Sequence, residues 1–190
     1  MIERSSMNVV AGRMQEDDLA QIMKIQSDNL REHLTPSLQK DGYLSIAFSE
    51  AEFRAFNLNL GVVVARARRA VIGYSCISDV EFNKQFPILD QIVANIPAYS
   101  IPGTNAKPSE GSSYFHGPVC IARSHRGKGV IEELFSKERE IATQKGYAHC
   151  FSFISCENTR SLKAHAKLSF QKVGSVSYKN KEYMVVACHI

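Results

Sequence analysis

The sequence predicts a mixed α/β protein that folds as one domain over residues 1–190. Segments rich in β-branched residues alternate along the chain with segments whose apolar residues recur at helical spacing. A length of 190 residues suits one compact domain and is too short for two ordinary ones. Hydrophobic residues make up 44% and charged residues 22%, close to globular averages, which excludes disordered and fibrous architectures.

The first elements are expected to be a strand and two helical segments. Residues 8–13 predict a short strand. Asp17 and Asp18 then begin a helix whose apolar positions keep helical spacing as far as Leu30. Pro36 follows Thr35 in the pattern of a short helical turn.

A capping pattern and a hairpin follow. Ser49 and Glu52 have the S-x-x-E spacing of a capping box, which predicts a helix that ends near Leu58. The β-branched runs at 61–67 and 70–80 predict two strands that are joined by a tight turn.

Residues 82–112 differ in composition from the rest of the chain. One helix is expected between Pro87 and Pro97, and the Pro-, Gly- and Ser-rich residues 100–113 predict a long surface loop. Long loops in compact domains are often functional, so we interpret 82–112 as a substrate-side insertion. Its apolar residues, Ile88, Tyr99 and Ile101 among them, would then line an acceptor pocket. The alternative is a variable insertion without a function.

The C-terminal half predicts regular alternation of strands and helices, without repeats. The expected elements are a strand at 113–122, a helix at 128–145, a strand at 148–155, a helix from Asn158 or Thr159 to Leu168, and strands at 171–178 and 182–190. Gly146 has the position of a helix-terminating glycine. The edge strands are compatible with a homodimer and equally with a single copy.

Charge and cysteine content narrow the functional classes. The net charge is +4, and the basic residues are scattered, which argues against a nucleic-acid partner. The five cysteines lack metal-ligand spacing, so no metal is expected. The N-terminal residues have no signal-peptide pattern, and Arg66, Arg68 and Arg69 interrupt the most apolar run. We therefore expect a soluble cytoplasmic protein with no membrane partner.

The most informative stretch is residues 119–135, where a strand runs into a glycine turn and a helix follows at once. Such a turn directs backbone N–H groups and the positive end of a helix dipole at one point. Gly127 and Gly129 allow a ligand to approach the backbone, while Arg126 and Lys128 add positive charge. The stretch predicts a diphosphate site, although glycine turns also occur without ligands. It fits neither the P-loop nor GxGxxG, whose third glycine position holds Glu132.

This stretch resembles motif A of the GNAT N-acetyltransferase superfamily, R/Q-x-x-G-x-G/A. Arg126 and Gly129 match, whereas Ile131 stands where the family has Gly or Ala. The segment NTRSLKAHAKLSF is similar to the family's N-x-x-A-x-x-x-Y-x-K-x-G-F, with Asn158 in the first place and His165 in the place of Tyr. The order of elements also fits, so the resemblance covers most of the chain.

The resemblance implies a central mixed, mostly antiparallel sheet of six to seven strands whose central strands splay apart to hold acetyl-CoA, with helices on its faces. The pantetheine arm would pair with the backbone near Ile121, and the amides of the glycine turn would hold the diphosphate. Asn158 would bond the pantetheine arm, or serve only as a helix N-cap. The implied cofactor-binding residues are Ile121, Ala122, Arg123, Arg126, Gly127, Lys128, Gly129, Val130, Ile131 and Asn158.

The resemblance also implies an activity: direct transfer of the acetyl group from acetyl-CoA to a small amine or peptide acceptor, in a ternary complex. His165 would be the acid that protonates the thiolate, or else a buried histidine without a catalytic part. His116 is the candidate base. Strand alternation gives it the face opposite to Phe115, and the bases of the family fall in the register of Phe115, so a bulge would be needed. Glu157, Tyr114 or ordered water are alternatives. A second reading is a CoA-binding sensor or interaction module with little turnover.

Overall fold

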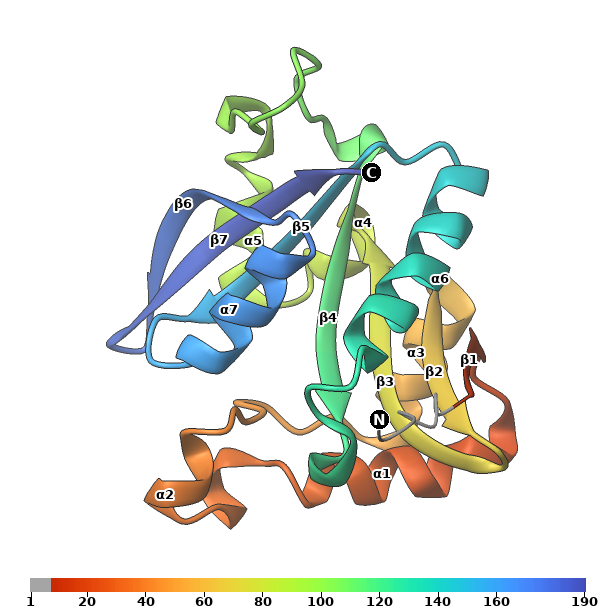
Figure 1. Cartoon of the computed structure of the whole chain (residues 1–190). Helices are drawn as coiled ribbons and strands as arrows, with labels where there is room; N and C mark the ends of the chain where they lie inside the picture. Colours follow the sequence, from red (N-terminus) through yellow and green to blue (C-terminus); the bar gives the residue numbers. More distant parts are fainter. Residues whose placement is uncertain (1–7) are drawn as a thin grey trace, which may run out of the picture.

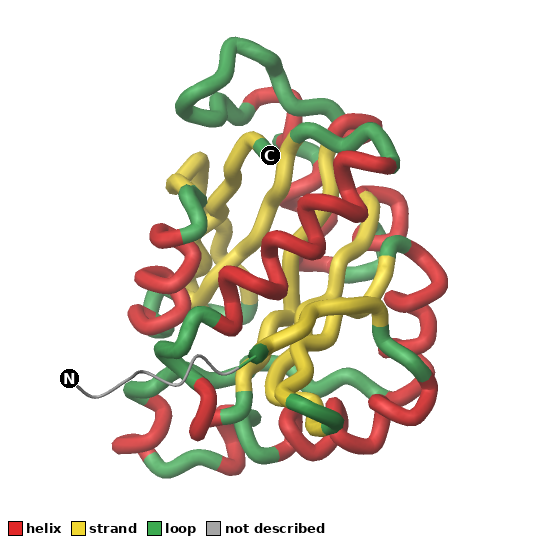
Figure 2. The backbone as a smooth tube through the Cα atoms, turned by 45° about the vertical axis from the view of Figure 1, so that its right-hand side comes forward, coloured by secondary structure: helices red, strands yellow, loops and turns green. Residues whose placement is uncertain are grey.

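Alternating apolar residues form seven strands in residues 8–190, which are the residues that this computed structural model describes (Figures 1 and 2). The strands are β1 (Val9–Arg13), β2 (Gly61–Ala67), β3 (Ala70–Asp79), β4 (Ser113–Ile121), β5 (His149–Ser155), β6 (Gln171–Tyr178) and β7 (Lys181–His189). They make one sheet in the order β1-β2-β3-β4-β5-β7-β6. The predicted mixed sheet is therefore confirmed.

The sheet is split at its centre. Every neighbouring pair is antiparallel except β4 and β5, which run parallel and pair only over Ser113–Phe115 and His149–Phe151. Beyond these three residues the two strands separate, and Figure 1 shows the gap widening toward the far end of β4. The expected splay of the central strands is confirmed, and it leaves backbone groups of both strands without sheet partners.

Helices cover both faces of the sheet. They are α1 (Leu19–Ser27), α2 (Pro36–Gln39), α3 (Glu50–Asn59), α4 (Val80–Asn83), α5 (Pro87–Val93), α6 (Val130–Gln144) and α7 (Thr159–Lys167). Because successive residues of β2 point to opposite faces, Val63 packs with α6 on one side and Val62 packs with α1 and α3 on the other. No helix in residues 8–190 is long and apolar enough to cross a membrane.

Two helix boundaries show how local signals compete with tertiary contacts. The predicted capping box is present: Ser49 accepts from the N–H of Glu52, whose carboxylate accepts from the N–H of Ser49. In contrast, α1 ends at Ser27 rather than at Leu30. Leu30 leaves the helix and forms a β-bridge with Leu44, which brings residues 41–44 beside the end of β4.

Residues 82–101 pack against the sheet, whereas most of residues 102–112 is exposed and forms the predicted surface loop, which extends beyond the sheet (Figures 1 and 2). The helix expected between Pro87 and Pro97 ends at Val93, and a 3-10 turn follows. Ile88 and Ile101 are buried in a core cluster with residues of β5 and β7, so they do not line an acceptor pocket. Tyr99 lies directly over Gly174 of β6, where a Cβ atom would be 2.8 Å from Cε1 of the tyrosine.

Candidate functional site

Backbone groups of β4 face the central gap. The N–H of Ala122 donates to the carbonyl of Ile72 in β3, so the amide of Ala122 is directed away from β5. In an antiparallel ladder every second residue of a strand bonds the same neighbouring strand. Cys120 and Ala122 bond β3, so the amides of Val119 and Ile121 are directed to the other side of β4, toward the gap. An extended ligand between β4 and β5 would therefore find sheet-like partners at these two residues.

The glycine turn after β4 has the conformation that anion sites require. Gly127 and Gly129 have φ values of 71° and 82°, in the left-handed region that favours glycine. Gly129 is the N-cap of α6 and offers no side chain to the first turn. The first N–H groups of a helix have no intrahelical acceptor, so those of Val130 and Ile131 remain free to bind an anion.

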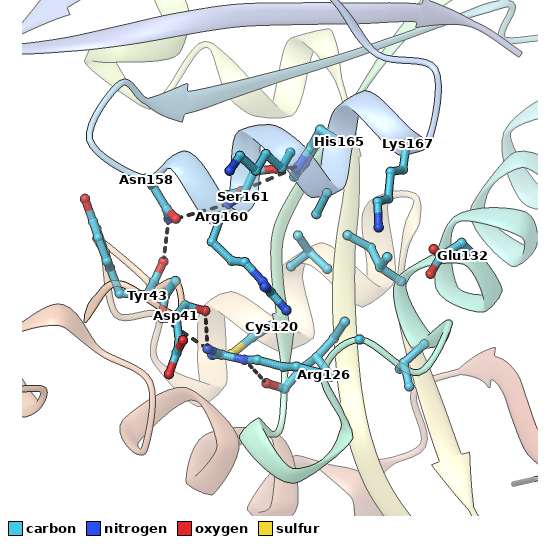
Figure 3. Close-up of a pocket in the computed structure, with 18 of the residues that line it drawn as sticks. Asp41, Tyr43, Cys120, Arg126, Glu132, Asn158, Arg160, Ser161, His165 and Lys167 are labelled. Atoms are coloured by element: carbon cyan, nitrogen blue, oxygen red, sulfur yellow. Dashed lines mark hydrogen bonds between the residues drawn. The ribbon is translucent and has the colours of Figure 1, made fainter. Parts of the chain in front are cut away.

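A cavity of about 310 Å³ joins the gap and the turn (Figure 3). Its walls are residues from four segments, within 41–44, 119–121, 126–132 and 158–167. This volume lies at the lower end of the range for small-molecule sites, which is about 300–1,000 Å³. Of the residues predicted to bind the cofactor, those that line the cavity are Ile121, Arg126, Gly127, Gly129, Val130, Ile131 and Asn158.

Three predicted cofactor residues do not line this cavity: Ala122, Arg123 and Lys128. The amide of Ala122 is used by β3, as described above. The guanidinium of Arg123 donates to the carbonyl of Leu38 at 3.1 Å and thus holds the segment after α1. Lys128 is exposed and is not among the residues that line the cavity.

Arg126 is a cross-link between segments. Its guanidinium donates to the carbonyls of Ile121, at 3.1 Å, and Asp41, at 2.6 Å, and to the side-chain oxygen of Asn29, at 2.6 Å. Burial lowers the pKa of Arg126, although the group remains charged. These bonds hold residues 41–44 against the glycine turn, a cross-linking role that the sequence alone did not indicate.

Arg160 is a candidate ligand that the sequence analysis missed. It lies in the first turn of α7, and its Nη2 atom comes within 3.8 Å of the position that a Cβ atom would take at Gly127. Figure 3 shows its side chain extending from α7 toward the turn. A cation there can balance an anion on the α6 N-terminus. In the sequence Arg160 has the pattern of an ordinary exposed helix residue. The one available signal was its place in a segment that is similar to a cofactor motif.

Asn158 is the N-cap of α7 and also a bridge between segments. Its Oδ1 atom accepts from the N–H of Ser161 at 3.2 Å, and its Nδ2 atom donates to the carbonyl of Tyr43 at 3.1 Å. One amide hydrogen is left over, since a side-chain amide has two. Asn158 can therefore cap the helix and still donate to a ligand in the cavity that it lines.

His165 lies in the cavity wall but is 2% exposed. Its Nδ1 atom is 2.9 Å from the carbonyl of Ser161, so Nδ1 carries the hydrogen of the neutral ring. Burial, helped by nearby His116, lowers the pKa of His165 to about 3. The ring is thus neutral at pH 7, its only N–H is bound to a carbonyl, and Nε2 can only accept. This arrangement does not fit the predicted role of a cationic acid.

His116 lies behind the cavity rather than in it. Its Nδ1 atom is 2.7 Å from Oε2 of Glu138 on α6, and both side chains are fully buried. The ring packs among Phe135, Phe170 and His165 on the α6–α7 side of β4. A bulge does follow His116 in β4, but the ring stays on this inner face. His116 therefore does not contact the cavity as the predicted base would.

Glu138 was also missed, although a signal for it was present. It lies four residues after Leu134 and three before Ile141, within the apolar stripe of α6. A charged residue in such a stripe needs a buried partner, and His116 is that partner. Among residues 8–190, no group of three or more His, Cys, Asp and Glu side chains is arranged to hold a metal ion.

A second, open groove of about 600 Å³ shares one lining residue, Leu44, with the cavity. The groove lies between the connection that follows α1 and Lys181 at the start of β7. At this end of the molecule Arg31 pairs with Glu157 at 2.9 Å and lies over the ring of Tyr43, 5.0 Å from its centre. The predicted alternative base Glu157 is thus already paired. The hydroxyl of Tyr114, another alternative, is buried without a partner.

Comparison with known proteins shows similarity in structure only. No model of a known protein family matches the chain, and no curated protein does. A protein from Salmonella typhimurium, described as an acetyltransferase and solved with its cofactor acetyl-CoA, superposes with a TM-score of 0.61 at 17% identity, over 95% of this chain and 93% of that one. An N-acetyltransferase from Staphylococcus aureus Mu50 gives 0.63 at 19% identity, over 96% and 98% of the two chains. The ribosomal-protein-S18-alanine N-acetyltransferase from Escherichia coli gives 0.62 at 8% identity, over 96% and 94%.

Proposed function

The chain has the fold of the GCN5-related N-acetyltransferases, and on this premise we propose that it transfers an acetyl group from acetyl-CoA to a primary amine. A fold by itself does not specify an activity, so the proposal depends on the site. The observation that carries it is the continuity of the cavity. One cavity reaches from the free amides at the start of α6 to the unpaired edge of β4.

This continuity suits the two chemically different parts of acetyl-CoA. A diphosphate would accept from the first amides of α6 and pair with Arg160. The amide groups of a pantetheine arm would bond Val119, Ile121 and Asn158. The residues present therefore fit this ligand. Ile131, which replaces a small residue of the family pattern, lines the wall of the cavity.

For the transfer itself, the acceptor must arrive as a free amine beside the thioester. We propose that it arrives through the groove that shares Leu44 with the cavity. Water would take the proton of the ammonium group, because neither His116 nor Tyr114 reaches the cavity. A free β4 amide would stabilise the oxyanion that forms when the amine attacks. The groove is lined by charged residues of both signs, Arg31, Glu32 and Lys181. Its charge therefore does not select one class of primary amine.

One observation favours a second candidate function, that of a CoA-binding module with little turnover. The residue in the place of the family tyrosine, His165, has no N–H directed at the cavity. If no other group supplies a proton to the thiolate, the protein would bind acetyl-CoA and transfer slowly. Binding and turnover must therefore be measured separately.

The test begins with calorimetric titration of acetyl-CoA into the wild-type protein, Arg160→Glu and Arg139→Glu. Arg139 is an exposed residue of α6 outside the cavity, so its variant is a charge-matched control. We expect micromolar binding that Arg160→Glu weakens about tenfold or more and that Arg139→Glu leaves unchanged. No binding at millimolar acetyl-CoA would refute the proposal.

Turnover is then followed as free thiol, with phenethylamine, spermidine and an alanine-terminated tripeptide as acceptors. Acetylation of any of them above the uncatalysed rate supports the transferase. Tight binding without turnover on all three supports the binding module.

A further inference from the structure

Three cations follow one face of α7 and line the cavity. They are Arg160, Lys163 and Lys167, which are spaced by three and four residues and therefore lie within about 60° of one another around the helix axis. Figure 3 shows the side chains of Arg160 and Lys167 extending from α7 on the side of the glycine turn and α6. The cavity thus has a cationic wall on α7 in addition to the free amides at the start of α6.

The positive charge of this wall is not neutralised by the protein. In the described part of the chain no carboxylate forms an ion pair with any of the three cations. Of the two acids that line the cavity, Asp41 pairs with Arg123 at 3.5 Å, and Glu132 lies in the first turn of α6, where the helix dipole already stabilises an acid. Like charges at helical spacings of three and four residues repel one another. The wall therefore favours an anionic ligand.

Arg160 and the two lysines lie at different distances along α7. Arg160 is the cation proposed above for the diphosphate, and its Nη2 atom lies over Gly127 of the glycine turn. Lys163 and Lys167 are about 4.5 Å and about 10.5 Å further along the helix axis. They are four residues apart, which places their Cβ atoms about 5–6 Å from each other. Two ammonium groups at this spacing can hold one anionic group between them, next to the group that Arg160 binds.

A phosphate monoester is the kind of group that such a pair fits. It carries a charge of about −1.5 to −2 at pH 7 and has three acceptor oxygens, so it can accept from two ammonium groups at once. Each phosphate of a diphosphate bridge has less charge and fewer free oxygens. Coenzyme A contains both kinds of group, because its diphosphate is joined to the 5′ position of a ribose whose 3′ position carries a monoester. The width of one ribose separates them, which is comparable to the step along α7 from Arg160 to the lysines.

We propose that Lys163 and Lys167 form a subsite for the 3′-phosphate of coenzyme A, and that this subsite makes the protein selective for coenzyme A thioesters over donors that lack the 3′-phosphate. Thioesters of a phosphopantetheine arm on a carrier protein are donors of that second kind. The inference rests on the proposed function, which requires coenzyme A in the cavity. The family pattern leaves the position of Lys163 open, so the pair is not part of the resemblance.

The test is calorimetric titration of coenzyme A and of 3′-dephospho-coenzyme A into three proteins: the wild type, a site variant and a control variant. The site variant combines Lys163→Met with Lys167→Met, which keeps two unbranched side chains and removes both charges. The control variant combines Lys107→Met with Lys145→Met and removes the same charge from two exposed lysines that do not line the cavity. Because all four lysines are exposed, both variants should unfold at the wild-type temperature.

We expect the wild-type protein to bind coenzyme A about tenfold or more tightly than 3′-dephospho-coenzyme A. The site variant should reduce this preference to about twofold by weakening the binding of coenzyme A alone. The control variant should keep the preference, and so should Lys163→Arg with Lys167→Arg, since arginine also binds phosphate. Equal wild-type affinities for the two ligands, or a preference that survives in the site variant, would overturn the proposal. If neither ligand binds, the proposed function fails as well.

A second measurement tests direct contact with the phosphate. ³¹P NMR follows the second ionisation of the 3′-phosphate, whose pKa is about 6 in a free monoester. Two nearby ammonium groups favour the dianion, so this pKa should fall when coenzyme A binds the wild-type protein and should stay near its free value in the site variant. An unchanged pKa in the wild-type complex would refute the contact. If coenzyme A binds with the expected preference but no amine is acetylated, the transferase function fails and the subsite stands.

Discussion

The cross-linking role of Arg126 leads to a prediction about stability in the absence of any ligand. The substitution Arg126→Met keeps the aliphatic stem and removes the guanidinium, which bonds Ile121, Asp41 and Asn29. A hydrogen bond to a charged group contributes about 1.5–3 kcal/mol, but this site is half-buried and water from the cavity can replace part of the loss. We therefore expect a loss of about 3 kcal/mol.

For a chain of this size, 1 kcal/mol corresponds to a shift of about 2–4 °C in Tm, so Arg126→Met should lower Tm by roughly 6–12 °C. The assay is thermal unfolding without ligand, followed by circular dichroism. Arg126→Lys should lose most of the same stability, since an ammonium group cannot span three segments as a planar fork does. Lys128→Met removes the neighbouring exposed cation and should shift Tm by about 1 °C at most. A wild-type Tm for Arg126→Met, with acetyl-CoA binding lost, would refute the reasoning and return Arg126 to a purely ligand-binding role.

Two further predictions concern pH and packing. Because burial lowers the pKa of His165 to about 3, below the 6.5 of an exposed histidine, its contribution to stability is complete above about pH 6.5 and is lost as the pH falls toward 3. The free energy of unfolding, measured in urea, should therefore fall by about 2 kcal/mol less in His165→Phe than in the wild-type protein when the pH is lowered from 7 to 5. Equal falls in the two proteins would contradict this. Gly174→Ala should lower the free energy of unfolding in urea by about 1–2 kcal/mol, because its Cβ atom would lie 2.8 Å from the ring of Tyr99. Adding Tyr99→Leu should restore the loss. An unchanged stability of the single variant would show that Tyr99 moves freely.

The order of elements could be predicted because each one carries a local signal. The capping box at Ser49 and the β-branched hairpin after Gly61 are specified by neighbouring residues alone. The end of α1 could not be predicted, since Leu30 keeps helical spacing and departs only because Leu44 offers it a bridge. Residues 100–109 have a loop composition, which conceals that Ile101 is buried beneath the sheet.

The candidate site was predictable to the extent that backbone geometry determines it. The positive φ values at Gly127 and Gly129 follow from the glycines themselves, and a helix that starts there has free amides. Side-chain roles depended on distant segments. Arg126 bonds residues more than eighty positions away, and His116 is directed inward by Glu138, a residue of the next helix. No local pattern encodes such contacts.

The short junction between β4 and β5 has a mechanical consequence. The ladder between the two halves of the sheet covers Ser113–Phe115 and His149–Phe151, close to one end. Forces that pull β4 and β5 apart therefore act on a few hydrogen bonds at a time, as when a zipper is opened. A molecule bound along the gap would bond both halves of the sheet far from that junction, where each bond opposes separation of the strands most effectively. A ligand bound there would therefore stiffen the protein in this direction.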